Sequence, residues 1–126
     1  MENTDDLAGR ESVCAEDLRG RVLMVGGGSP PELRAVQQRI IDTVHVQYFN
    51  SNDRETTLTN IKAHRGICLA PGFLNDHNGE FSWVPFECPE KICCVLCTHS
   101  GDKRESVRDF VKLLQKMYRE RPEFMA

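Results

Sequence analysis

The chain repeats one local pattern: an apolar run, a short polar turn, and a segment with apolar residues at helical spacing. Residues 22–25 lead into a glycine-rich turn and a helix, and residues 44–49 lead into an Asn/Ser/Asp turn and another helix. Such repeats are typical of strand–helix units in a parallel sheet, where both helices begin at the same edge. We therefore expect an α/β fold that presents two helix N-termini, with their free N–H groups, at one edge.

Capping residues predict where these two helices begin. Ser29 is the expected N-cap of the first helix, Pro30 its first helical residue, and an acidic residue follows three positions after the cap. Ser51 or Asn52 is the expected N-cap of the second helix, which should end near Gly66.

The remaining pattern predicts three more strands and a third helix. Residues 67–70 form a buried strand, and residues 81–86 and 92–98 are further strand candidates. Residues 103–120 form the clearest amphipathic helix, with one apolar stripe made of Val107, Phe110, Val111, Leu114, Met117 and Tyr118. We expect a mostly parallel, three-layer sheet with helices on both faces.

Two expectations concern organisation. Residues 1–13 are polar and aperiodic, which predicts a flexible leader before a single domain at residues 14–126. Trp83 is expected in the core of that domain.

Charge and hydropathy argue against nucleic-acid binding and against membrane insertion. The 126 residues contain 16 Lys plus Arg and 19 Asp plus Glu, a net charge of −3, without a basic stripe that would neutralise nucleic-acid phosphates. The apolar run at residues 92–97 is too short for a membrane span, and residues 1–11 are too polar for a signal peptide. We expect a cytoplasmic protein that contacts neither DNA nor membrane through this chain.

The six cysteines do not form a persuasive metal or catalytic pattern. Cys93 and Cys94 are adjacent on a predicted strand, so they point to opposite faces and do not bridge each other, which favours buried, reduced thiols. Strand alternation brings at most Cys93, Cys97 and His99 to one side, short of a tetrahedral zinc set. No local signature pairs a cysteine with a histidine base. We expect no metal, no cofactor and no enzymatic activity.

Several segments, taken in order, resemble a known family. They are Glu-Asp-Leu-Arg-Gly at 16–20, the helix, turn and apolar strand at 60–71, Val-Pro-Phe at 84–86 followed by Pro89, and Val-Arg-Asp-Phe at 107–110. This order is similar to the second half of the effector-binding domain of LysR-type transcriptional regulators, whose fold is similar to type 2 periplasmic binding proteins. One departure is His64, which stands where the family usually has a glycine. A left-handed backbone is tolerable at a histidine but less favourable than at a glycine, so we expect the end of this helix to differ in detail from the family.

The resemblance implies a sensing function. In the family a small polar or anionic effector lies between two subdomains, and DNA is bound through a helix-turn-helix domain; neither that domain nor the first subdomain has a counterpart here. Tight turns and plain helix capping explain the same residues without a ligand. The expected effector-binding residues are Gly28, Ser29, Asn50, Ser51, Asn52, Pro71 and Phe73.

The stripe of the terminal helix would lack its usual cover, because in the family this helix packs on the missing subdomain. Exposing several large apolar side chains is costly, since burial of each favours folding by about 1.5 to 3 kcal/mol. We therefore expect the stripe to fold back locally or to form a homodimer through Val107, Phe110, Val111, Leu114 and Met117. The alternative to sensing is a free-standing interaction module that uses this stripe.

Overall fold

The computed structural model describes residues 1–26, 28–75, 77–93 and 95–121. The chain divides into two compact units, Met1–Ile92 and Cys93–Ala126, and each is described by itself. The first unit has α/β character, with a three-stranded, all-parallel sheet and two α-helices.

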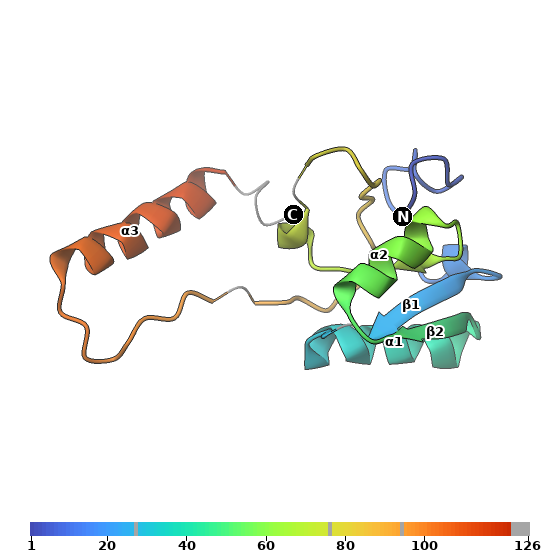
Figure 1. Ribbon diagram of the computed structural model, residues 1–126, viewed down its shortest axis with the longest axis horizontal. Helices are drawn as coiled ribbons and strands as arrows, with labels where there is room; N and C mark the ends of the chain where they lie inside the picture. Colours follow the sequence, from blue (N-terminus) through green and yellow to red (C-terminus); the bar gives the residue numbers. More distant parts are fainter. Residues whose placement is uncertain (27, 76, 94, 122–126) are drawn as a thin grey trace. The chain divides into compact units, whose positions relative to one another are not determined.

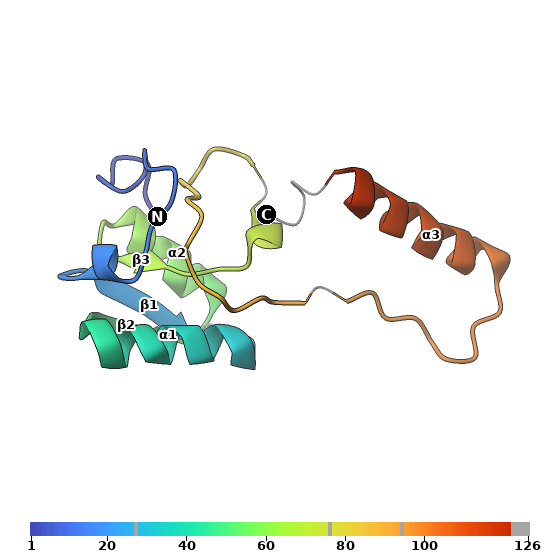
Figure 2. The same ribbon diagram turned by 180° about the vertical axis from the view of Figure 1, so that it is seen from behind.

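The sheet consists of β1 (Val22–Gly26), β2 (Gln47–Ser51) and β3 (Ile67–Cys68), in the order β2-β1-β3. Figure 1 labels β1 and β2, and Figure 2 labels all three strands. β1 pairs in parallel with both neighbours, and Gly26 lies opposite Ser51 where β1 and β2 end. Because both strands run the same way and each is followed by a helix, the two helices begin at one edge, and that prediction is confirmed.

The first helix, α1 (Pro31–Val44), begins one residue later than predicted. Pro30 is extended, with φ −64° and ψ 159°, and is the N-cap. A proline disfavours helical backbone in the residue before it, so Pro31 excludes Pro30 from the helix. Ser29 donates its hydroxyl to the carbonyl of Gly26 at 2.6 Å, and the prediction that it caps the helix is wrong.

This helix also ends later than predicted. Val44 was expected to open the second strand, but it is the last residue of α1 and is buried on the helical face that includes Ile40. His45 then stops the helix in the left-handed region, with φ 58° and its N–H donating to the carbonyl of Ile41 at 3.1 Å. His45 is therefore a helix cap, and its predicted place in a strand is wrong.

The second helix, α2 (Arg54–Lys62), is capped by Asp53, whose carboxylate accepts the N–H of Thr56 at 2.7 Å. The prediction of Ser51 or Asn52 as cap is wrong, because Ser51 is still paired with β1 and the chain leaves the sheet only after it. Beyond the helix, His64 has φ 55°, so this histidine adopts the left-handed backbone that a glycine adopts more easily.

The core of the first unit lies where α1 packs against the sheet. The segment expected to be a flexible leader contributes Leu7 and Val13 to it, and Trp83, expected in the core, is 39% exposed. The buried members are Leu7, Val13, Leu18, Leu23, Val36, Ile40, Val44, Val46 and Ile67.

Two predicted strands are absent from the described residues. Within 81–86 only Phe86 makes a bridge, parallel to Val13, where the Val13 N–H donates to the carbonyl of Pro85 at 2.8 Å. Pro85 and Pro89 lack the N–H donors that a longer ladder needs, which explains why pairing stops there. The described residues of 92–98 form no strand, because no sheet edge pairs with them.

The second unit contains α3 (Glu105–Glu120), which confirms the predicted terminal helix to within two residues (Figure 2). No residue of α3 is buried, and two stripe residues, Phe110 and Met117, are 56% and 42% exposed. In this unit the apolar stripe is therefore open to solvent.

Candidate functional site

All residues predicted to bind an effector lie at the carboxyl edge of the sheet. Gly28 and Ser29 follow β1, Asn50 and Ser51 end β2 and Asn52 follows it, and Pro71 and Phe73 come after β3. Because the three strands are parallel, these segments leave the sheet at the same side. These segments therefore follow the ends of strands that share one edge, and the role of the seven residues in binding stays a prediction.

The strand order identifies one position along this edge. The connection through α1 leads from β1 to β2 on one side, and the connection through α2 returns past β1 to β3 on the other. Open α/β sheets commonly bind ligands where the chain reverses direction in this way, which is between β1 and β3, whereas the end of β2 lies on the other side of β1. The segments that flank this point are residues 26–30 and 69–73.

The turn after β1 depends on glycine. Gly26 has φ +87° and Gly28 has φ +85°, a region that other residues rarely adopt. A Cβ on Gly26 would lie 2.7 Å from the carbonyl oxygen of Ser51 and would also clash with Oδ1 of Asn50. Close contact between the ends of β1 and β2 therefore requires Gly26, which the sequence interpretation placed in the turn but not in the site.

Ser51 carries the most informative polar group of this edge. Ser51 is only 3% exposed, and its hydroxyl oxygen is buried without a hydrogen-bond partner among the described residues. A buried hydroxyl left unpaired costs about 1 to 3 kcal/mol, so such groups generally have a partner in the functional state. Ser51 was predicted as a ligand contact or a helix cap, and its hydroxyl is free because Asp53 provides the cap.

The start of α2 is negatively charged. Asp53 accepts the backbone N–H of Thr56, and this bond holds the pKa of its carboxyl below the ordinary value. Glu55 adds a second carboxylate in the first turn. Arg54, the first residue of α2, offsets one of these two charges. Asn52, which was predicted to contact an effector, lies exposed beside this helix start.

The start of α1 carries a carboxylate too, from Glu32 in its first turn, but it also has a guanidinium and free N–H donors. No side chain caps it, and Pro30 and Pro31 have no N–H, which leaves the N–H groups of Glu32 and Leu33 without partners inside the helix. Arg34 reaches back and donates its Nε–H to the carbonyl oxygen of Ser29 at 2.9 Å. The donors and the guanidinium at this end suit an acceptor oxygen of a ligand. Sequence reasoning missed Arg34, although its position one helical turn after Pro30 was a usable signal.

Pro71 and Phe73 lie beyond β3, around the 3-10 turn η2 (Gly72–Leu74). The carbonyl of Pro71 accepts the N–H of Leu74 at 3.0 Å, so Pro71 helps to close this turn. Phe73 is 39% exposed and offers an apolar surface at the β3 side of the edge.

The cysteines and histidines do not gather into a reactive cluster. Cys14, Cys68 and Cys88 are half-buried, whereas Cys93 and Cys97 are exposed, which corrects the expectation that these thiols are buried; Cys94 lies outside the described residues. Burial raises the pKa of the Cys68 thiol, which disfavours the reactive thiolate. In the described part of the chain, no three metal-ligating side chains lie close enough together to hold an ion.

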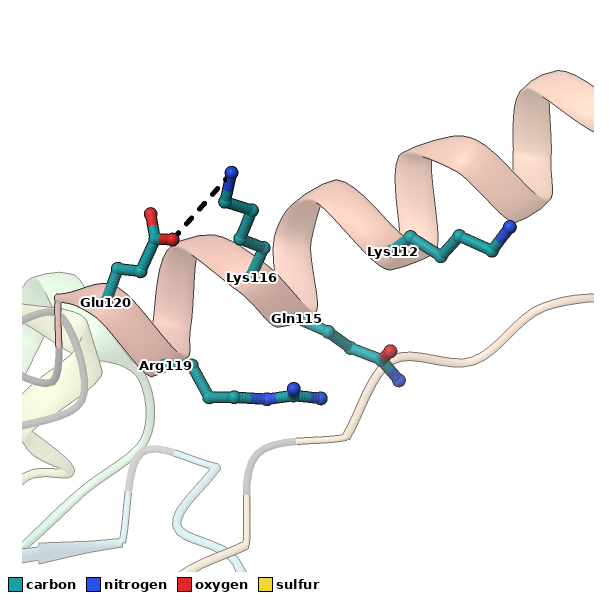
Figure 3. Close-up of a pocket in the computed structure, with 5 residues that line it drawn as sticks. All are labelled: Lys112, Gln115, Lys116, Arg119 and Glu120. Carbon is teal, nitrogen blue, oxygen red and sulfur yellow. Dashed lines mark ion pairs between the residues drawn. The ribbon is translucent and has the colours of Figure 1, made fainter.

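A hollow of about 320 Å³ lies on α3 and is lined by side chains of that helix alone (Figure 3). Lys116 forms an ion pair with Glu120 at 3.7 Å, and both side chains are well exposed. The other lining residues are Lys112, Gln115 and Arg119. This hollow is an open, mostly basic helix surface, and it lacks the apolar walls typical of small-molecule sites.

Comparisons with known proteins show no matching family model, no matching curated protein and no matching solved structure. The similarity to LysR-type regulators is therefore carried by the residues quoted above alone. None of the helices within the described ranges is both long and apolar enough to cross a membrane.

Proposed function

We propose that the carboxyl edge of the sheet binds a small polar or anionic molecule and that the chain senses this molecule without transforming it. The observation that carries the proposal is the buried Ser51 hydroxyl, which has no hydrogen-bond partner among the described residues and belongs to the residue opposite Gly26 at the end of the strands. A ligand oxygen or nitrogen would satisfy this hydroxyl where binding opens the edge enough to reach it.

The charges along the edge indicate how such a ligand would be oriented. Acceptor groups of the ligand would lie toward the uncapped start of α1 and the Arg34 guanidinium, and away from Asp53 and Glu55 at the start of α2. Phe73 would contact an apolar part of the ligand.

The wider setting that we propose is the effector-sensing portion of a cytoplasmic LysR-type transcriptional regulator, with a three-layer, periplasmic-binding-protein-like fold. The packing of β1 supports a sheet that is covered on both faces. Leu23 belongs to the core cluster with Val36 and Ile40 of α1, whereas Met24 is buried outside that cluster. Successive strand residues point to opposite faces, so both faces of β1 are covered. A ligand would act by binding one state of the regulator more tightly than another.

Thermal-shift measurements with a panel of small carboxylates, amino acids and sugars test the binding proposal. We expect at least one compound to raise the melting temperature of the wild-type chain, and Ser51→Ala to remove that response. Because its hydroxyl has no partner in the structure, Ser51→Ala should leave the ligand-free stability unchanged or raise it by up to about 1 kcal/mol.

Thr43→Ala is the matched control for loss of a hydroxyl. Thr43 donates to the carbonyl of Arg39 at 2.7 Å, near the far end of α1, so this variant should keep the response to ligand. A panel that leaves the wild-type melting temperature unchanged, or a response that survives in Ser51→Ala, would contradict the proposal.

A second candidate function is protein interaction through α3, and the observation that favours it is the open stripe. Phe110, Met117 and Tyr118 are all more than 40% exposed, and contiguous exposed apolar surface commonly marks an interaction site. Pairing of two copies through this stripe is the form that we propose for this candidate, and Phe110→Lys would weaken it.

A further inference from the structure

β2 forms an open edge of the sheet. It pairs with β1 along Gln47–Ser51, and no other described segment pairs with it. Four of its five residues are exposed, and only Ser51 is buried. One side of this strand therefore presents backbone N–H and C=O groups that no protein group satisfies.

This edge lacks the features that usually prevent strands from pairing between molecules. Residues 46–52 contain no charged residue and no proline, and the register with β1 is continuous over five pairs, without a bulge. Natural edge strands are generally protected by lysine, proline, a bulge or very short length. β3 at the other edge of the sheet is only two residues long, so its short length protects it.

The side chains of β2 also favour an added strand. Tyr48 is 59% exposed and Phe49 is 48% exposed, and because successive residues of a strand face opposite sides, each face of the edge carries an open aromatic ring. A partner that covers both rings must itself be an extended, uncharged strand with apolar groups on both faces.

We propose that β2 pairs with β2 of a second copy of this chain, antiparallel, to give a continuous six-stranded sheet. The strand itself meets every requirement for the partner, and a two-fold axis presents the same patch on both sides of the interface. With the axis at Phe49, all five residues pair: Phe49 lies opposite Phe49 of the second copy, Tyr48 opposite Asn50, and Gln47 opposite Ser51. Aromatic side chains placed directly opposite each other stabilise such pairs.

Analytical ultracentrifugation of the full chain over a range of concentrations tests this interface. We expect the wild type to form a dimer and Phe49→Lys to raise the dimer dissociation constant by about tenfold or more, because like charges would then lie directly opposite each other. Phe49 is already half exposed in the single chain, so the variant should keep its fold, and circular dichroism checks this.

A mixture of Phe49→Lys and Phe49→Glu provides the decisive measurement. Only a two-fold axis at residue 49 places the two new charges opposite each other. We expect this mixture to dimerise where each variant alone does not. Leu74→Lys, at a site of similar exposure, should leave the dimer unchanged. A monomeric wild type, or a mixture that does not dimerise, would overturn the proposal. A dimer lost in Phe110→Lys but retained in Phe49→Lys would also overturn it and would assign the interface to α3.

Discussion

At the scale of single residues, Asp53 shows how one side chain fixes a helix start and a local charge together. Its carboxylate accepts the N–H of Thr56 at 2.7 Å, and this backbone hydrogen bond is the main cause of its lowered pKa. A lowered folded-state pKa means that the ionised carboxylate contributes stability above the ordinary aspartate pKa. The contribution is lost as the pH falls through the lowered value.

Asp53→Asn isolates this effect, because asparagine keeps a capping oxygen but does not titrate. We expect the wild type to unfold at a higher temperature than Asp53→Asn near neutral pH, and the difference to shrink as the pH is lowered from about 6 to about 2, below the ordinary aspartate pKa. Thermal unfolding followed by circular dichroism at several pH values measures it. A difference that does not change with pH would show that the charge of Asp53 does not stabilise α2.

At the scale of elements, glycines decide how closely helix and strand connections approach the sheet. Gly66 joins α2 to β3, and a Cβ at this position would clash with the carbonyl oxygen of Val22 and lie 2.7 Å from Cε of Met24. The Val22 oxygen belongs to the backbone of β1, so it cannot move aside as a flexible side chain could.

We therefore expect Gly66→Ala to destabilise the protein by about 1 to 3 kcal/mol through overpacking. Gly9→Ala is the matched control, because a Cβ at Gly9 meets nothing within 4 Å; it should change the stability by less than about 0.5 kcal/mol. Urea unfolding of both variants provides the comparison. Equal stabilities would mean that the β1–β3 junction can relax around the added methyl group.

At the scale of the whole molecule, the hydrophobic core and the carboxyl edge both belong to the first unit. Every buried member of the core cluster lies between Leu7 and Ile67, and later residues only pack against it. The segment up to Ile92 is held to this unit by specific contacts, including a bidentate ion pair from Arg39 to Glu90 at 2.7 Å.

A fragment of residues 1–92 should therefore fold by itself. We expect it to unfold cooperatively, with a free energy of unfolding within about 1 kcal/mol of the full chain, because the contributions of independent units are additive. Urea unfolding monitored by Trp83 fluorescence tests this. A fragment that unfolds gradually would show that residues after 92 contribute to the same core.

Most of the correct predictions came from patterns among residues that lie close together along the chain. The three parallel strands and the helices α1, α2 and α3 follow from apolar spacing. Boundaries moved by one to four residues, from one residue at the start of α1, where Pro31 excludes Pro30, to four at the end of α2, which ends at Lys62. The prediction of a strand at 92–98 is wrong for the described residues of that segment, because an apolar run does not by itself specify that the segment joins a sheet.

The sequence by itself determined the α/β character, the common edge of the two helix starts and the amphipathic nature of α3, because these depend on residues close together along the chain. Only the tertiary structure decided the order β2-β1-β3, the reversal point between β1 and β3, and the burial of Ser51 without a partner. It also decided that β2 is an open edge. The reason is physical: strand order and burial depend on contacts between residues far apart in sequence, and the apolar pattern of β1 is compatible with either strand as its neighbour on either side.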